Sequence, residues 1–451
     1  MGTAGRRLAS SAVEMPKVQV PKLDEVVKMC RDKGFAAASA GGYGGARGCY
    51  DYLPLGAELK RKVQQRWWRE FVEKRMGVHG VETPILTLPR VLEAAGHVEH
   101  FGDPLISCAG CGAPLRADAG GACTGCGKKK QPAGASDAAT MFNLLFETAA
   151  GAGEAKRSMY LRPETAQGMF TSLNETVRAL RIAQLPFGVA SMGKAFRNEI
   201  SPREFLFRVR EFEQGEVEWF VARDEADAAF HEWLNFSHQW LVRLLNHPHQ
   251  LLRVEHHDAG SLAHYARATA DIEFKYPFGW GELWGVADRG QHDVQAHAAA
   301  TGDKVPALLD DAVVIEPSVG FDRLVFALLV DAMAVREGSD DAERSVLRLD
   351  PAIAPVTATV LPLVAKDEEL VKHAKVLATG LSTVIGSVSY EASGSVGKRY
   401  RRADSIGVPF CVTVDAQSLN DQTYTLRFRD TMLQERVDVN DLVARISEAT
   451  R

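Results

Sequence analysis

The segment 193–220, GKAFRNEISPREFLFRVREFEQGEVEWF, limits the possible folds more than any other part of this chain. Its phenylalanines and valines predict a β-strand. Charged side chains nevertheless fall on both faces of that strand: Arg208, Arg210, Glu211 and Glu213. Because unpaired charge is costly to bury, neither face can pack as ordinary core. The strand is therefore either a solvated edge strand or the floor of a polar cavity in which arginines hold phosphates and carboxylates hold an ammonium group.

Apolar residues predict a long helix earlier in the chain. Leu59, Val63, Trp67 and Phe71 recur every four residues, which gives the helix a broad apolar stripe. Packing against the core explains the stripe, whereas the adjoining Trp68 favours a subunit interface. A strand-like segment follows at 81–83. Further on, the pattern predicts helices over 224–247 and 324–335 and strands over 271–286 and 312–316.

Composition suggests three parts. Residues 104–157 are rich in Gly and Ala and read as a module inserted into a larger domain. The hydrophilic stretch 336–350 is the best domain boundary, and strand and helix patterns alternate after it, as in a compact α/β domain. We therefore expect an N-terminal extension over 1–33, a main domain over 34–350 and a second domain over 351–451.

Four of the seven cysteines form two close pairs, Cys108-x2-Cys111 and Cys123-x2-Cys126. Two such pairs in a glycine-rich module predict a four-thiolate structural zinc site. Incidental thiols or a redox pair are the alternatives. The other cysteines are scattered singly, which favours a reducing compartment over a secreted disulfide framework.

Several motifs in order resemble one family. Segment 193–220 resembles motif 2 of class II aminoacyl-tRNA synthetases in its glycyl form, and residues 77–86 resemble motif 1. RPETAQG, FGWGELWG and YGGARGCYDYLPLG resemble glycyl-enzyme signatures, and EPSVGFDR resembles motif 3. Agreement of several motifs in the right order is more specific than any single one.

The resemblance implies an α+β fold: a catalytic domain built on an antiparallel sheet, a zinc-knuckle insertion, and a C-terminal α/β anticodon-binding domain. It also implies that motif 1 forms the interface of a homodimer. The implied reaction joins glycine to tRNA(Gly) through glycyl-adenylate, with ATP and Mg²⁺ as cofactors.

Site residues follow from the same resemblance. Arg197, Glu199 and Arg323 are the implied catalytic residues. ATP-binding residues are implied to be Arg197, Asn198, Glu199, Phe207, Arg208, Val209, Arg210, Glu211, Phe212, Glu282, Leu283, Gly320, Phe321, Asp322 and Arg323, with Glu282 as magnesium partner. Glycine-binding residues are implied to be Arg116, Glu164, Phe212, Glu213, Gln214, Gly215, Glu216, Glu316, Pro317, Ser318, Val319 and Gly320. Gly215 stands where relatives often carry a bulkier residue, and we expect it to alter packing near the pocket.

The basic segment GKRYRR at 397–402 has two interpretations. It is either a solvated basic strand or an RNA contact in which Tyr400 stacks on a base. The resemblance to an anticodon-binding domain favours RNA and implies Lys398, Arg399, Arg401 and Arg402 as phosphate contacts. The net charge of −5 gives RNA binding no global support, so any contact must come from such local patches.

We expect a cytoplasmic protein without a membrane segment, because no long apolar run occurs. The N-terminus, with Arg6 and Arg7, leaves a weak organellar transit peptide as an alternative. A non-catalytic, synthetase-like nucleic-acid-binding accessory protein is the alternative function. Such a protein should have lost its phosphate-binding arginines, but Arg197 and Arg323 are present.

Overall fold

The computed structural model describes residues 17–117, 123, 126–128, 140–258, 266–336 and 346–450. The possible transit peptide and most of the hydrophilic stretch expected as a domain boundary lie outside these residues. Within them, no helix is both long enough and apolar enough to cross a bilayer.

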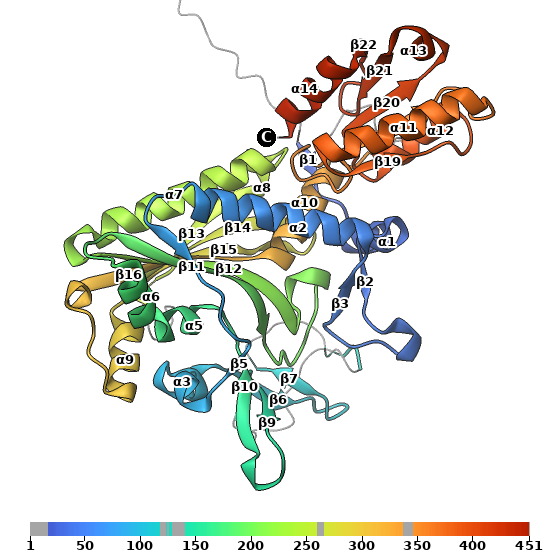
Figure 1. Ribbon diagram of the computed structural model, residues 1–451. Helices are drawn as coiled ribbons and strands as arrows, with labels where there is room; N and C mark the ends of the chain where they lie inside the picture. The colour runs from blue at the N-terminus through green and yellow to red at the C-terminus, as the bar shows by residue number, and fades with distance from the viewer. Residues whose placement is uncertain are drawn as a thin grey trace, which may run out of the picture.

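A seven-stranded sheet organises the larger part of the molecule (Figure 1). Its strands, in spatial order, are β13 (Leu252–His256), β14 (Ala268–Tyr276), β15 (Gly279–Gly290), β16 (Ala312–Gly320), β12 (Glu211–Ala222), β11 (Phe187–Phe196) and β4 (Val78–Gly80). Neighbours are antiparallel except β4 and β11. The charged strand β12 lies between β11 and β16, so the edge-strand interpretation is wrong.

Helices cover one face of this sheet. They are α2 (Pro54–Trp68), α7 (Ala226–Leu244) and α10 (Phe321–Met333), and α1 (Leu23–Lys33) adds Val26 and Cys30 to the same core. Phe71 stands at the centre of an aromatic cluster, with its ring centroid 5.4 Å from that of Trp67 and 5.1 Å from that of Trp284. The long helix predicted from periodicity is confirmed, since α2 continues through a π-helical turn over Arg69–Glu73.

The two neighbouring tryptophans of α2 have different surroundings. Trp67 is fully buried in the core. Trp68 is half-buried and lies over Gly80, where an added Cβ would come within 2.3 Å of the indole. Packing within the chain therefore accounts for both, and a subunit interface here stays a prediction.

The opposite face of the sheet is only partly covered. Helices α5 (Ala166–Thr171), α6 (Leu173–Leu180) and α9 (His292–Thr301) pack near one end of the strands. Side chains alternate along a strand, so Trp219 and Val221 enter the helix-covered core while Phe220 packs on this second face. The rest of the second face is left open for a cleft.

Two small sheets lie beyond that open face. One contains β5 (Leu86–Thr87), β10 (Arg157–Leu161) and β9 (Phe146–Ala150), and the other contains β7 (Pro114–Arg116), β6 (Gly102–Ser107) and β8 (Thr140–Asn143). The strand predicted at 81–83 is wrong, because the strand in this region, β4, occupies the three preceding residues. Val81 still donates its amide to Ala190 (2.8 Å), but Pro84 has no amide hydrogen to continue the ladder.

The C-terminal part has its own sheet and core. Its strand order is β19 (Val388–Tyr390), β18 (Ala358–Pro362), β20 (Phe410–Val414), β21 (Thr423–Phe428) and β22 (Gln434–Asp438), and β18 is parallel to both of its neighbours. Helices α11 (Glu368–Ile385), α12 (Val396–Ser405), α13 (Ala416–Asp421) and α14 (Val439–Ala449) pack around it. The predicted α+β fold with a C-terminal α/β part is confirmed.

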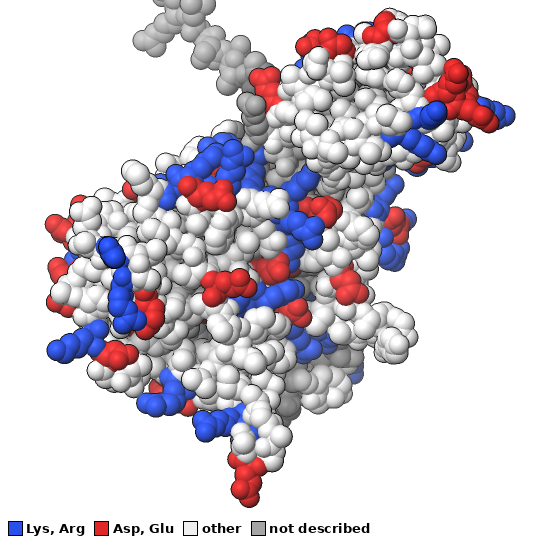
Figure 2. All heavy atoms as spheres, in the orientation of Figure 1, with Lys and Arg blue, Asp and Glu red and all other residues white. Residues whose placement is uncertain are grey.

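The basic segment 397–402 lies on α12, so the strand interpretation is wrong. Arg399 and Ala403, one helical turn apart, are buried together, which is the spacing of a helix face and not of a strand. In Figure 2, Lys and Arg side chains also gather over α2, beside the C-terminal part, while charges of both signs are mixed elsewhere on this view.

Candidate active site

A cleft of about 340 Å³ opens on the uncovered face of the large sheet. Most of the side chains predicted as site residues line it. They are Glu164, Arg197, Glu199, Phe207, Arg208, Val209, Phe212, Gln214, Glu216, Glu282, Leu283, Glu316, Ser318, Gly320, Asp322 and Arg323. Residues of β12 and β16 reach the cleft at every second position, as strand geometry requires.

Arginines dominate one side of the cleft. Arg323 donates to Glu282 (Nη1 to Oε2, 3.0 Å) and to the carbonyl oxygen of Phe207 (3.1 Å). Its guanidinium lies 4.3 Å from the centre of the Phe207 ring. Arg208 pairs with Glu199 at 3.2 Å. This arrangement of planar cations beside an aromatic ring suits a polyphosphate attached to a flat base.

Arg197 lies between two aromatic rings. Its guanidinium is 5.3 Å from the ring centres of both Phe101 and Phe212, and its Nε donates to the carbonyl oxygen of Pro163 (3.2 Å). These contacts hold the side chain at the wall of the cleft, and no carboxylate of the described residues forms an ion pair with it. Its positive charge therefore remains available to an anion.

Buried carboxylates dominate the other side, around an arginine that sequence reasoning missed. Arg289, at the end of β15, is 1% exposed. Its Nη1 donates to Glu316 Oε2 at 2.8 Å, its Nε donates to Asp293 Oδ2 at 2.8 Å, and its Nη2 lies 3.8 Å from Glu164 Oε1. The one sequence signal for it was the acidic Asp293 four residues later, at the spacing of one helical turn.

Two glutamates of this side accept hydrogen bonds from amide and hydroxyl groups. Glu216 accepts hydrogen bonds from the amide of Thr165 (2.9 Å), from Gln214 (3.0 Å) and from Ser318 (2.8 Å). Glu164 accepts one from Gln167 (3.0 Å) and lies 3.3 Å from the Nε2 atom of His97. His97 and Gln167 were likewise missed.

Burial changes how these carboxyl groups titrate. It raises the pKa of Glu316 to about 8, even though the adjacent Arg289 acts in the opposite direction. Burial, followed by repulsion from Glu164, also raises the pKa of Glu216. Glu218, next along the same face of β12, has its pKa raised well above the usual range by burial and then by Glu316, and neither of its oxygens has a hydrogen-bond partner in the described part of the chain. The cluster therefore holds more acid groups than its cations balance, which favours a cationic ligand.

Other predicted residues do not line the cleft: Arg116, Asn198, Arg210, Glu211, Glu213, Gly215, Pro317, Val319 and Phe321. Glu213 lies on the helix-covered face of β12, where it pairs with Lys60 of α2 (2.8 Å) and accepts from Gln64 (2.6 Å). Burial alone would raise the pKa of Glu213, but Lys60 outweighs it and the pKa is lowered. The expectation that Glu213 binds glycine directly is therefore wrong.

Gly215 lies on that same helix-covered face. A Cβ there would come within 2.9 Å of the Phe321 ring and 3.0 Å of the Trp67 ring. The residue acts on the packing between β12 and the helices, and the expected position in the glycine pocket is wrong. Val319 and Phe321 are fully buried in the same core, and Pro317 alternates with the cleft-facing residues of β16.

The remaining predictions concern residues at the periphery. Arg116 pairs with Asp103 (2.9 Å) in the small sheet. Asn198 donates its amide to the carbonyl of Leu144 (2.7 Å), and Arg210 donates to the carbonyl of Glu199 (3.1 Å). These residues shape the loop between β11 and β12 and do not reach the cleft itself. Glu211 pairs with Lys194 (2.8 Å) outside it.

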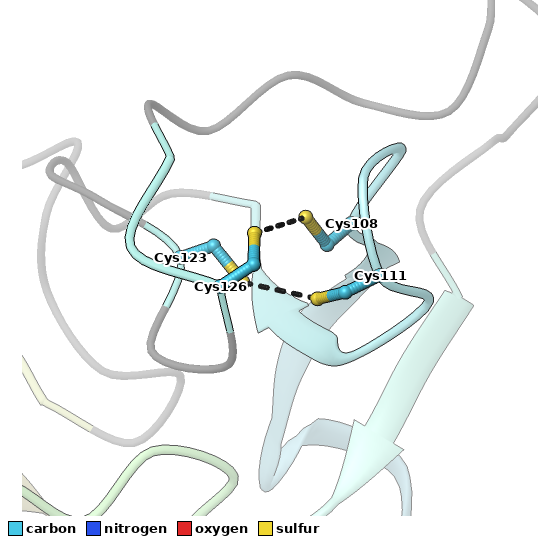
Figure 3. Close-up of side chains that lie close together, drawn as sticks. All are labelled: Cys108, Cys111, Cys123 and Cys126. Atoms are coloured by element: carbon cyan, nitrogen blue, oxygen red, sulfur yellow. Dashed lines mark hydrogen bonds between the residues drawn. The ribbon is translucent and has the colours of Figure 1, made fainter.

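Four thiols converge at the edge of the small sheet that contains β6 and β7 (Figure 3). The sulfur atoms of Cys108 and Cys126 are 3.9 Å apart, those of Cys111 and Cys123 are 3.6 Å apart, and all four lie within 4.8 Å of one another. Zinc–sulfur bonds of about 2.3 Å in a tetrahedron place sulfur atoms about 3.8 Å apart. The donor set and its spacing therefore fit a structural zinc ion.

The four basic residues predicted to contact tRNA divide into two kinds. Lys398, Arg401 and Arg402 are exposed on α12, and Arg402 lies 3.3 Å from Glu391. Arg399 is 2% exposed, and its guanidinium donates to the carbonyl oxygens of Pro362 (2.5 Å) and Leu363 (3.3 Å). Arg399 is therefore wrong as a phosphate contact, because its guanidinium is buried and faces carbonyl oxygens inside the domain.

Comparison with known families agrees with this architecture. A family model described as the tRNA synthetase class II core domain (G, H, P, S and T) matches residues 146–383, and one described as an anticodon binding domain matches residues 357–449. The sheet and its cleft are thus those of a class II tRNA synthetase core. The two matches overlap, so they do not locate the domain boundary.

Curated relatives narrow the class. The chain is 39% identical to the glycine–tRNA ligase of Alkaliphilus oremlandii over 94% of this chain and 98% of that protein. It is 38% identical to that of Geobacillus thermodenitrificans (94% and 96%) and 40% identical to that of Bifidobacterium longum (95% and 93%). This chain belongs to the glycine–tRNA ligase family.

Proposed function

We propose that this protein is a glycine–tRNA ligase that activates glycine with ATP and transfers it to tRNA(Gly). The observation that carries the proposal is the division of one cleft into an arginine side and a buried carboxylate side. The first suits the triphosphate of ATP, and the second suits an amino acid's ammonium group.

The first step joins glycine to AMP. A carboxylate oxygen of glycine attacks the α-phosphorus of ATP, the bond to the bridging oxygen breaks, and pyrophosphate leaves. Arg197 and Arg323 are proposed to hold the phosphates and to stabilise the charge that develops on them. Phe207 and Phe212 are proposed to stack on the adenine, within the segment that also contacts the phosphates.

The second step transfers the glycyl group. A terminal ribose hydroxyl of tRNA attacks the carbonyl carbon, AMP leaves with the bonding electron pair, and the hydroxyl proton is released. No covalent bond to the protein is needed. The site acts by positioning and charge neutralisation.

Glycine is proposed to bind with its ammonium group among Glu164, Glu216 and Glu316, beside Ser318. Arg289 keeps Glu316 and Asp293 in place. A larger amino acid would have to fit its side chain into a site whose walls are held by this network. One missing methyl group changes the binding free energy by about 1–3 kcal/mol, and the steric penalty for an extra group can be larger than that.

Cofactors and partners complete the proposal. Glu282 is the proposed protein contact for magnesium, which would neutralise phosphate charge, and the four cysteines would hold a structural zinc ion. The exposed Lys398, Arg401 and Arg402 are proposed to contact tRNA phosphates. A homodimer through residues 77–86 and a cytoplasmic location, where tRNA is charged, remain part of the proposal.

Amino-acid-dependent ATP–pyrophosphate exchange tests this function. We expect exchange with glycine and none above background with alanine or serine. Arg197→Ala should abolish the exchange while leaving the circular dichroism melt unchanged. Exchange with alanine or serine in place of glycine would refute the substrate, and no exchange with any of the three would favour a non-catalytic tRNA-binding protein.

A further inference from the structure

The amide of Gln167 has every hydrogen-bonding atom committed inside the protein. Gln167 lies on α5 and is 2% exposed. Its Nε2 donates to Glu164 Oε1 (3.0 Å) and to Asp293 Oδ1 (2.9 Å), and its Oε1 lies 2.8 Å from the Nε2 atom of His297 on α9. Neither Gln167 nor His297 lines the cleft.

These contacts close a ring with Arg289. The Asp293 Oδ1 atom that accepts from Gln167 also accepts from Arg289 Nη2 (2.9 Å), and Glu164 approaches the same guanidinium nitrogen (3.8 Å). The order around the ring is Glu164, Gln167, Asp293, Arg289. Two carboxylates thus lie between one cation and one neutral amide, and the position of each depends on the other three.

Charge explains why the member opposite Arg289 is an amide. Burial alone would raise the pKa of Glu164, but His97, Arg289 and the Gln167 hydrogen bond outweigh it and the pKa is lowered. Asp293 shows the same balance, with burial opposed by Arg289 and Gln167, and its pKa is also lowered. Both groups are therefore ionised. The residue between them must donate two hydrogen bonds, which a carboxylate cannot do.

His297 selects the orientation of that amide. A glutamine amide can rotate by half a turn, which exchanges its oxygen and nitrogen, and in the wrong orientation its oxygen would face two carboxylates. Since the Gln167 oxygen points to His297, the imidazole must carry its proton on Nε2 and donate it. Burial lowers the pKa of His297, so the ring is held neutral.

We propose that Gln167 is a positioning residue for the glycine subsite and that His297 acts through it by fixing the orientation of its amide. Gln167 keeps Glu164 at the ammonium end of the subsite and keeps Asp293 bound to Arg289, which in turn holds Glu316. This inference rests on the proposed function. It adds two residues behind the cleft that set the affinity for the amino acid without touching it.

Steady-state ATP–pyrophosphate exchange tests the role of Gln167. Gln167→Glu places a third carboxylate against Glu164 and Asp293, and we expect the KM for glycine to rise by about tenfold or more while the KM for ATP stays within about twofold. Gln167→Met removes the donors without adding charge and should raise the KM for glycine less. Gln295→Glu, on the exposed side of α9, makes the same chemical change and should leave both constants unchanged.

A second pair of variants tests His297. His297→Phe keeps a ring but removes the donor, so we expect the KM for glycine to rise as in Gln167→Met. His297→Gln keeps an N–H near the Nε2 position and should restore a value within about twofold of wild type. This pair decides the question even if Gln167→Glu does not fold.

Different failures have different meanings. If wild type shows no glycine-dependent exchange, the proposed function fails. If wild type is active but folded Gln167→Glu and His297→Phe keep the wild-type KM for glycine, the positioning role is refuted. An equal rise in the KM for ATP, or a loss of active protein at unchanged KM, would also refute it, because a merely structural residue would act in that way.

Discussion

At the scale of single residues, the side of a strand on which a glutamate stands decides its role. Glu213 and Glu216 are three residues apart on β12, yet Glu213 pairs with Lys60 under the helices while Glu216 lies in the cleft with its carboxylate held by Thr165, Gln214 and Ser318. Residue type alone treated them as equivalent. The alternation of side chains along the strand separates them.

The raised pKa of Glu316 predicts how glycine affinity depends on pH. With a pKa of about 8, Glu316 is mostly protonated near neutrality and must lose its proton to hold an ammonium group. We therefore expect glycine to bind more tightly as the pH rises from about 6 to about 8, by up to tenfold per unit, with release of a proton. Calorimetric titrations in buffers of different ionisation enthalpy measure that proton.

The control for this prediction is Glu316→Gln, which has no proton to lose at that position. It should bind glycine more weakly and release less proton than wild type at the same pH. Proton uptake by wild type, or an affinity that falls between about pH 6 and 8, would contradict the assignment of Glu316 as an ammonium partner.

At the scale of elements, Gly215 sets the distance between β12 and its covering helices. Gly215→Ala would press a methyl group against Phe321 and Trp67, and overpacking of this kind costs about 1–3 kcal/mol. We expect a lower melting temperature and a nearly unchanged KM for glycine. Gly285→Ala on β15, whose added Cβ would meet its nearest atom at 3.7 Å, is the control for the melting temperature alone, because Gly285 lines the cleft. If the melting temperature of Gly215→Ala were at or above that of wild type, the helices would accommodate the methyl group without loss of stability, and the prediction would be wrong.

The cysteine module predicts a metal-dependent element. Elemental analysis should find one zinc per chain, and Cys111→Ser with Cys126→Ser should remove it. Burial is the main cause that lowers the pKa of Arg208 in the cleft, and the charge of Arg116 lowers it further. Arg116 lies on β7, in the small sheet at whose edge the cysteines lie, so a change in this sheet should affect the ATP site. Chelation should therefore loosen β6 and β7 in hydrogen exchange and reduce glycine activation. Unchanged activation after complete loss of zinc would refute the link.

The sequence could predict elements whose signal is local. The apolar stripe of α2 follows from a four-residue spacing, and strand character in segment 193–220 follows from its phenylalanines and valines. The site around Arg289 could not be predicted, because it depends on α5, α9, β15 and β16 meeting in space. The basic helix α12 was ambiguous, since charged residues alone do not distinguish a strand from a helix until the burial of Arg399 is known.

At the scale of the whole molecule, polar contacts join the two parts of the chain. Lys62 of α2 donates to the carbonyl of Ala354 (2.6 Å) and to Thr357 (3.1 Å), and Arg429 donates to the carbonyl of Leu349 (2.8 Å). Helix α2 therefore contacts the start of the C-terminal part through Lys62 and contacts β12 through Lys60. Such contacts connect the part of the chain that carries α12 to a helix that covers the large sheet.

The exposed face of α12 predicts a separation of activities. Lys398→Glu with Arg401→Glu should lower the rate of tRNA charging by about tenfold or more at low salt, because phosphate contacts supply much of RNA affinity. ATP–pyrophosphate exchange, which needs no tRNA, should stay at the wild-type rate. Arg178→Glu on α6, an exposed charge change remote from α12, should leave charging unaffected. Equal charging by the double variant would exclude this helix as a tRNA contact.

The transfer of labelled glycine to tRNA is the most direct test of the proposed function as a whole. The purified protein, supplied with ATP, magnesium, glycine and tRNA(Gly), should attach glycine to the intact 3′ end, and it should fail when periodate has oxidised the terminal ribose. Alanine and serine should not be attached. Attachment of either of these amino acids in preference to glycine, or no attachment of any amino acid by folded protein, would contradict the assignment.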